Sequence, residues 1–256
     1  SVTLGSGITK IGNAAFRGTS SLTTITLPTG LTDIYGEAFE NSGLTSIEIP
    51  DTVTYLGSRV FMGTRLTSID VPGSIVNLPS DAFRNISTLT SAVIGEGVTY
   101  IGTSAFQSTT NLTSVQLPST LTRIDGKAFN GSGLTSVNLS EGLTYIGPEA
   151  FRDAKLTSLT LPSTLERVFH YAFYNNPLES LSINSDITFY VNSNEQYLGV
   201  FSGMCNTLTT ASINGLSEIP NELFKYCSQL TSVTLGDGIT KIGDSSFEAT
   251  SSLTTI

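Results

Sequence analysis

The stretch that decides the fold is Leu22-Thr23-Thr24-Ile25-Thr26-Leu27-Pro28-Thr29-Gly30-Leu31-Thr32-Asp33-Ile34-Tyr35-Gly36-Glu37-Ala38-Phe39. A variant of this phrase returns every 22 or 23 residues along the 256-residue chain, with a single longer spacing of 28. A fixed period of this length predicts a solenoid, because one repeat cannot bury its apolar residues alone and stacked repeats share one core. The clearest markers of the repeat are the phenylalanines Phe16, Phe39, Phe61, Phe83, Phe106, Phe129, Phe151, Phe173, Phe201, Phe224 and Phe247.

Each repeat has three parts. Apolar residues such as Ile25 and Leu27 alternate with polar ones, which predicts a short strand that a proline or glycine stops. The segment from Leu31 to Ile34 predicts a second short strand before a turn. A capping residue ahead of the Ala-Phe pair predicts a single helical turn. We therefore expect residues 1–256 to form one mainly β solenoid of about eleven coils, with a parallel sheet on one face and short helical turns and second strands on the other.

The pattern L-x-x-I-x-L-P-x-x-L-T-x-I-G-x-x-A-F resembles the BspA-type, or Treponema pallidum-type, leucine-rich repeat family over essentially the whole chain. This resemblance implies a right-handed leucine-rich-repeat solenoid on a bacterial or protozoan surface, often an adhesin that binds host proteins. The family also often carries a cysteine three positions after the phenylalanine. Cys227 matches that position, and Cys205 is displaced from it by one residue.

Charge and hydropathy exclude several partners. Twelve basic and 21 acidic residues give a net charge of −9, which repels phosphate backbones and anionic lipid surfaces. No apolar run approaches the roughly 20 residues that span a bilayer. We therefore expect no nucleic-acid partner, no membrane insertion in this segment and no cofactor. Residues 1–25 and 232–256 match at 19 of 25 positions, so we expect the chain to be a segment of a longer repeat array, with stacking of its uncapped ends as the alternative.

One outward column lies just before the inner residue of each second strand. Aromatic residues occupy alternate coils of this column, and arginines lie between them. Aromatic and arginine residues are the usual anchors of protein interfaces, and aromatic rows also stack on sugar rings. The same residues could also form an internal cation–π ladder. The alternative explanation is that tyrosine simply suits half-exposed strands. The candidate binding column is Tyr55, Tyr100, Arg123, Tyr145, Arg167 and Phe189.

The outward face of the main strands carries an unbroken Ser/Thr column beside a mixed polar one. The candidate residues of this sheet face are Glu48, Asp70, Gln116 and Asn138. Glu48 and Asp70 hold equivalent positions in neighbouring coils, so their backbones should lie about 5 Å apart. Such carboxylate pairs occur in retaining glycosidases and in Ca²⁺ sites, but a flat, open face favours a solvated acidic patch. An ice-binding hydroxyl lattice is disfavoured because the mixed column breaks its regularity.

Coil nine departs from the repeat, since Ile187 and Phe201 are 14 residues apart where 8 is usual. We expect an inserted surface loop that either binds a partner or is a tolerated bulge. Its candidate residues are Tyr190, Asn192, Asn194, Glu195 and Tyr197. Cys205 and Cys227 each lie three residues before a leucine, so we expect stacked free thiols rather than a disulfide. His170 is the lone histidine, and we expect an exposed turn residue there rather than a catalytic one.

The sequence thus favours a non-enzymatic, extracellular or cell-surface module that binds a protein partner, for example a host extracellular protein. Two alternatives stay open at this point. One is a structural array or filament that stacks through its ends, and the other is a glycan-binding surface on the tyrosine column.

Overall fold

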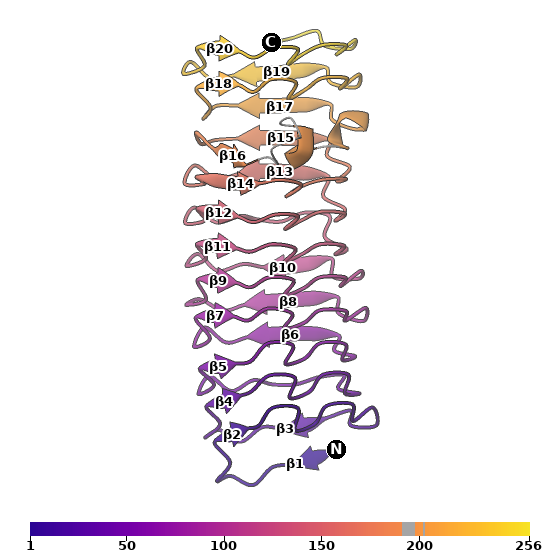
Figure 1. The fold of residues 1–256 in the computed structure, drawn as a ribbon, viewed down its shortest axis with the longest axis vertical. Coiled ribbons are helices and arrows are strands. Elements are labelled where there is room, and N and C mark those ends of the chain that lie inside the picture. The colour runs from indigo at the N-terminus through magenta and orange to yellow at the C-terminus, as the bar shows by residue number, and fades with distance from the viewer. Residues whose placement is uncertain (191–197, 202) are drawn as a thin grey trace.

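The chain winds into a tall stack of coils, with its two termini at opposite ends of the stack (Figure 1). The computed structural model describes residues 1–190, 198–201 and 203–256. The repeat predicted a mainly β solenoid with parallel pairing, and the structure confirms it. Within the described ranges, no helix combines the length and apolar character needed to cross a bilayer.

Two sets of strands run up the stack on different sides of each coil (Figure 1). The main strands are β1 (Val2–Thr3), β3 (Ile25–Thr26), β6 (Ser68–Val71), β8 (Ser91–Ile94), β10 (Ser114–Gln116), β13 (Ser158–Leu161), β15 (Ser180–Ile183), β17 (Thr210–Ile213) and β19 (Ser232–Leu235). The second strands are β2 (Lys10–Ile11), β4 (Asp33–Ile34), β5 (Tyr55–Leu56), β7 (Asn77–Leu78), β9 (Tyr100–Ile101), β11 (Arg123–Ile124), β12 (Tyr145–Ile146), β14 (Arg167–Phe169), β16 (Thr188–Tyr190), β18 (Glu218–Ile219) and β20 (Lys241–Ile242). Equivalent residues of neighbouring coils pair in parallel, as Ser158 does with Ser180.

The core is a set of columns of like side chains. Successive phenylalanine rings from Phe16 to Phe201 stack with centroids 5.1–5.8 Å apart. Leu31 and Ile34 are fully buried beside them. Burying each side chain of this size contributes about 1.5–3 kcal/mol, so the inward residues of the repeat supply the stability that the short strands alone would lack.

The segment around the phenylalanine is a run of turns in every coil except coil nine, where Phe201 ends a short helix, so the predicted helical turn is wrong for the other coils. The N–H groups of Glu37 and Phe39 donate to the carbonyls of Ser58 and Val60 in the next coil, at 2.9 Å each. A helix would keep these bonds within the coil. Glu37 has φ 59°, a left-handed conformation that costs a non-glycine residue about 1–2 kcal/mol, and the bonds between coils offset that cost. The helical segments of the described residues are α1 (Leu198–Phe201) and η1 (Met204–Asn206).

The main sheet is interrupted at coils three and seven, where residues 46–49 and 136–139 belong to no strand. In both places the loop after the phenylalanine is one residue shorter than the loop of the preceding coil, and it ends in Gly43 or Gly133. A Cβ on Gly133 would lie 2.5 Å from the carbonyl oxygen of Thr110. At Gly43 and Gly133 only glycine lets the loop pack this closely against the backbone of the preceding coil. In both coils, the residues that follow do not join the main sheet.

The second sheet is interrupted between β5 and β7. In the flanking coils, the N–H of Gly57 donates to the carbonyl of Ile34 at 2.8 Å, and the N–H of Gly102 donates to that of Leu78 at 2.9 Å. Pro79 holds the equivalent position in coil four and has no N–H to donate. The carbonyl of Leu56 therefore lacks this ladder bond, which explains why the sheet is divided here.

Candidate binding surfaces

Four members of the predicted column pair in register on neighbouring second strands. Arg123 pairs with Tyr100 on one side and with Tyr145 on the other. Tyr145 also pairs with Arg167. Because these strands are parallel and in register, the four side chains emerge on the same face of the sheet. Tyr55 belongs to the same column but is separated from the four by the sheet interruption at coil four.

A hydrogen-bond network fixes the first part of this column. The hydroxyl of Tyr100 donates to Oδ2 of Asp125 at 2.8 Å, and the hydroxyl of Thr103 donates to the same oxygen at 3.0 Å. Nη2 of Arg123 donates to Oδ1 at 3.0 Å. Burial alone would raise the pKa of Asp125, but these three hydrogen bonds together hold that pKa below its ordinary value. The carboxylate therefore holds a tyrosine and an arginine in fixed positions.

Ring contacts extend the column toward coil nine. The guanidinium carbon of Arg123 lies 3.7 Å from the ring centroid of Tyr145, and that of Arg167 lies 5.8 Å from it. Phe169 contacts Tyr145 at 4.9 Å and stacks on Tyr190 at 4.5 Å between centroids. The internal cation–π ladder that the sequence left open is thus present. We call the continuous surface of Tyr100, Arg123, Asp125, Tyr145, Arg167, Phe169 and Tyr190 the aromatic–arginine strip.

The predicted place of Phe189 in this column is wrong. Arg167 pairs with Thr188, and Phe189 pairs with the inward residue Val168. The second-strand segment of coil nine is one residue shorter than its neighbour, so every later residue of the strand changes face. Phe189 now packs edge-on against Phe201, with centroids 5.9 Å apart. Burial of an apolar ring explains why the shifted register is stable.

Tyr100 should give the strip a signature at alkaline pH. Burial, followed by the hydrogen bond to Asp125, raises the pKa of Tyr100 from 10.0 to about 12. Because the pKa of Tyr100 is higher in the folded chain than in the unfolded chain, the neutral hydroxyl stabilises the folded state. This stabilisation is complete below pH about 10 and is lost as the pH rises toward about 12. We expect the difference in melting temperature between the wild type and Tyr100→Phe to narrow over that interval. Thermal melts from pH 8 to pH 12 test this, and a constant difference would contradict it.

The main-sheet candidates Glu48, Asp70, Gln116 and Asn138 are all exposed. Asp70 pairs with Val93, which pairs in turn with Gln116. No strand pairing among the described residues joins Glu48 to Asp70, because coil three leaves the ladder. Glu48 and Asn138 instead line two open hollows of about 490 Å³ each, one at each interruption of the sheet. Across the described part of the chain, no group of three or more His, Cys, Asp or Glu residues could hold a metal ion.

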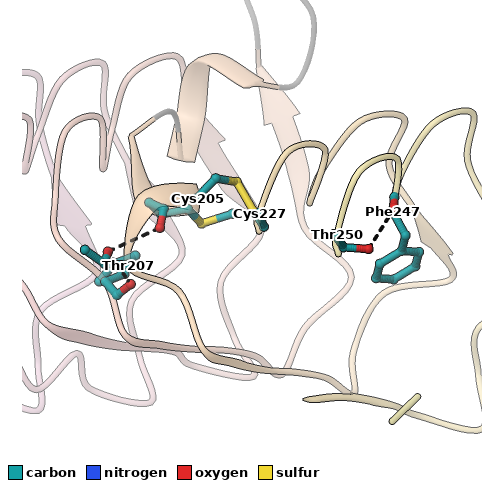
Figure 2. Close-up of a disulfide and its surroundings, with 7 residues drawn as sticks. Cys205, Thr207, Cys227, Phe247 and Thr250 are labelled. Carbon is teal, nitrogen blue, oxygen red and sulfur yellow. Dashed lines mark hydrogen bonds between the residues drawn. A yellow bond between two sulfur atoms is a disulfide. The ribbon is translucent and has the colours of Figure 1, made fainter. Parts of the chain in front are cut away.

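The expectation of two free thiols is wrong, since Cys205 and Cys227 form a disulfide between coils nine and ten (Figure 2). Counted from the leucines, the two cysteines are equivalent, which suggested parallel side chains. Counted from the phenylalanines, Cys205 lies one residue later and belongs to the turn η1. This offset lets the two side chains converge. Cys227 is fully buried, and Cys205 is half-buried.

The inserted loop of coil nine carries several predicted residues. Tyr190 is 42% exposed and ends the strip. Asn192, Asn194, Glu195 and Tyr197 lie outside the described residues. The histidine is half-buried rather than exposed, and its ring lies edge-on to Tyr171, with centroids 5.8 Å apart.

Sequence reasoning missed Asp125, Phe169 and Tyr35, which follow the inner residue of the second strand by one position. Glycine or proline occupies this position in most coils, so no regular pattern marks it. The signal that could have found these residues is the departure from glycine itself, since a larger side chain there points outward beside the column. Tyr35 lies 5.5 Å from Tyr55 between ring centroids.

Solved structures of bacterial proteins share this architecture. A leucine-rich repeat protein from Bacteroides ovatus is 24% identical, with a TM-score of 0.76 over 99% of this chain and 65% of that one. A leucine-rich repeat protein from Eubacterium ventriosum is 22% identical, with a TM-score of 0.57 over 99% of this chain and 71% of that one. A leucine-rich cell surface protein from Faecalibacterium prausnitzii is 21% identical, with a TM-score of 0.52 over 99% and 86%. At these identities the similarity establishes the fold, and the chain spans only about 65% of the Bacteroides ovatus protein.

No curated protein matches the chain. The family model for the BspA type leucine-rich repeat region matches it in six copies, over residues 1–109, 76–198 and 185–256. These matches together cover every coil, so the resemblance noted in the repeat pattern is confirmed. The chain belongs to the BspA-type leucine-rich repeat family.

Proposed function

We propose that this chain is a non-enzymatic, protein-binding module of a secreted or cell-surface protein, and that the aromatic–arginine strip is its contact surface. The observation that carries the proposal is the fixed arrangement of Tyr100, Arg123 and Tyr145. Large aromatic and arginine side chains dominate the binding energy of protein interfaces. Side chains that are already held in place lose less conformational entropy when a partner binds. The strip combines both properties on an outward face, where Arg167 and Tyr190 are exposed and the other members are half-buried.

Two further observations support the extracellular placement. Disulfides persist in oxidising compartments and are rare in the cytosol, and Cys205 and Cys227 form one here. The similar protein from Faecalibacterium prausnitzii is described by its name as a cell surface protein. The carboxylates considered for catalysis, Glu48 and Asp70, support a non-enzymatic role because both are exposed on an open face.

Surface plasmon resonance against purified extracellular-matrix and plasma proteins tests the proposal. We expect the double variant Arg123→Ala/Tyr145→Ala to weaken binding by at least about 100-fold, since two interface anchors each contribute about 2 kcal/mol or more. The matched control is Gln116→Ala/Thr160→Ala on the main sheet, where both side chains are exposed. This control should change the affinity by less than about threefold. Unchanged binding by the strip variant, or loss of binding by the sheet variant alone, would overturn the proposed surface.

A further inference from the structure

The interruption of the second sheet leaves a notch between coils three and five. A hollow of about 380 Å³ lies there, with Tyr55 at one end, Tyr100 at the other, and Val76 and Asn77 between them. Pro79 causes the interruption, because it cannot donate the ladder bond that Gly57 and Gly102 donate in the flanking coils. Proline recurs at this position in coil ten as Pro220, but the hollow beside coil four is the one that two tyrosines line.

Both tyrosine rings are supported on the side that faces away from the notch. Tyr35 contacts Tyr55 from coil two, with ring centroids 5.5 Å apart. Arg123 contacts Tyr100 from coil six, with its guanidinium carbon 5.9 Å from the ring centroid. The hydroxyl of Tyr100 is also held by Asp125. Each tyrosine ring is thus in contact with a neighbouring side chain away from the hollow, and each also lines the hollow. Tyr55 is 47% exposed.

The dimensions suit one six-membered ring between the two tyrosines. The tyrosines are two coils apart, and strand spacing places their backbones roughly 10 Å from each other. A ring in van der Waals contact with planes on both sides, at about 3.5–4 Å from each, needs about 7–8 Å. The smaller side chains of coil four, Val76 and Asn77, form the floor of the hollow between the two tyrosines. Val76 is 49% exposed.

The polar groups of the notch are neutral. Asn77 supplies an amide, and Ser58 and Ser80 supply hydroxyls. None of the described residues that line the hollow is charged, so neither a carboxylate nor an ammonium ligand finds a counter-ion there. Aromatic walls together with amide and hydroxyl groups are complementary to a ring that has apolar faces and a rim of hydroxyls.

We infer that this notch is a subsite for one neutral pyranose unit of an oligosaccharide, held between Tyr55 and Tyr100, with Asn77 hydrogen-bonding its hydroxyls. The inference does not rest on the proposed protein-binding function: Tyr100 belongs to both surfaces, but Tyr55 and Asn77 lie outside the strip, and Tyr145 and Arg167 do not line the notch. An oligosaccharide subsite would add a second kind of ligand on the same face of the solenoid.

Saturation-transfer NMR with maltotriose, cellotriose and lactose tests the inference. We expect saturation transfer to at least one of the three, and an affinity about tenfold weaker, equivalent to about 1.4 kcal/mol, in Tyr55→Ala and in Asn77→Ala. Tyr55→Phe keeps the ring and should bind as the wild type does, which separates loss of stacking from misfolding. Tyr145→Ala, outside the notch, should also bind normally.

Two outcomes would overturn the inference. One is the absence of saturation transfer to all three sugars at concentrations up to about 10 mM, a range that covers weak millimolar binding. The other is sugar binding that Tyr55→Ala leaves unchanged, which would place the sugar elsewhere on the molecule. Because Tyr145→Ala impairs only the strip, failure of this inference and failure of the proposed protein-binding function give different patterns.

Discussion

Replacing Phe129 by alanine is expected to lower the free energy of unfolding by about 3–5 kcal/mol, the range for large-to-small substitutions of a buried aromatic residue. Phe129 is fully buried near the middle of the stack. Its ring stacks on Phe106 and on Phe151, with centroids 5.2 Å away in both cases. The substitution would therefore remove two ring contacts and leave a cavity that the neighbouring coils cannot close. Urea denaturation followed by circular dichroism measures the loss.

Phe16→Ala is the matched control, because it removes the same side chain from the same position of the repeat. Phe16 is only half-buried, and within the described residues its ring stacks on Phe39 alone, at 5.2 Å. We expect this variant to lose less than half of the free energy that Phe129→Ala loses. Equal losses would contradict the view that each coil is stabilised mainly by its two neighbours.

Removing the disulfide is expected to destabilise the chain by about 3 kcal/mol, the chain-entropy value for a closed loop of this size. The bond between Cys205 and Cys227 spans 22 residues and joins the coil that carries the insertion to the coil that follows it. We expect Cys205→Ala/Cys227→Ala to melt at a lower temperature than the wild type under oxidising conditions.

A reductant provides the control for this prediction. It should lower the melting temperature of the wild type toward that of the double alanine variant and leave the variant itself unchanged. Maleimide labelling under denaturing conditions, without a reductant, should modify neither cysteine of the wild type. Two labelled cysteines, or a wild type that melts at the same temperature with and without the reductant, would contradict the stabilising role of the bond.

The inward half of the repeat could be predicted because its physical requirement is simple. The positions that Ile25, Leu31 and Phe39 hold in coil two face the core in every coil. Only apolar residues can be buried at these positions coil after coil. The arc around the phenylalanine could not be predicted in the same way. Glu37 and Lys127 have positive φ there, although neither residue type favours that conformation. Hydrogen bonds to the next coil stabilise the arc. The sequence of a single repeat does not indicate these bonds, because their acceptors belong to another coil.

The site departs from the sequence-based expectations where a coil departs from the ideal period of the repeat. A full-length second-strand segment in coil nine would put Phe189 outward, but the segment is one residue shorter, and a difference of one residue reverses the face. The distance to the leucine is the same for Cys205 and Cys227 and predicts parallel side chains, but the distance to the phenylalanine differs by one residue. The notch beside Tyr55 depends on Pro79, whose meaning appears only when its coil is compared with the two that flank it.

A partner protein is expected to bind on the aromatic–arginine strip. Hydroxyl-radical footprinting of the chain, alone and bound to a partner found by surface plasmon resonance, tests it most directly. Tyr145 and Tyr190 should be protected in the complex, whereas Tyr226, 61% exposed and outside the strip, should react equally in both states. Protection confined to the main-sheet face around Gln116, with Tyr145 and Tyr190 unchanged, would contradict the claim.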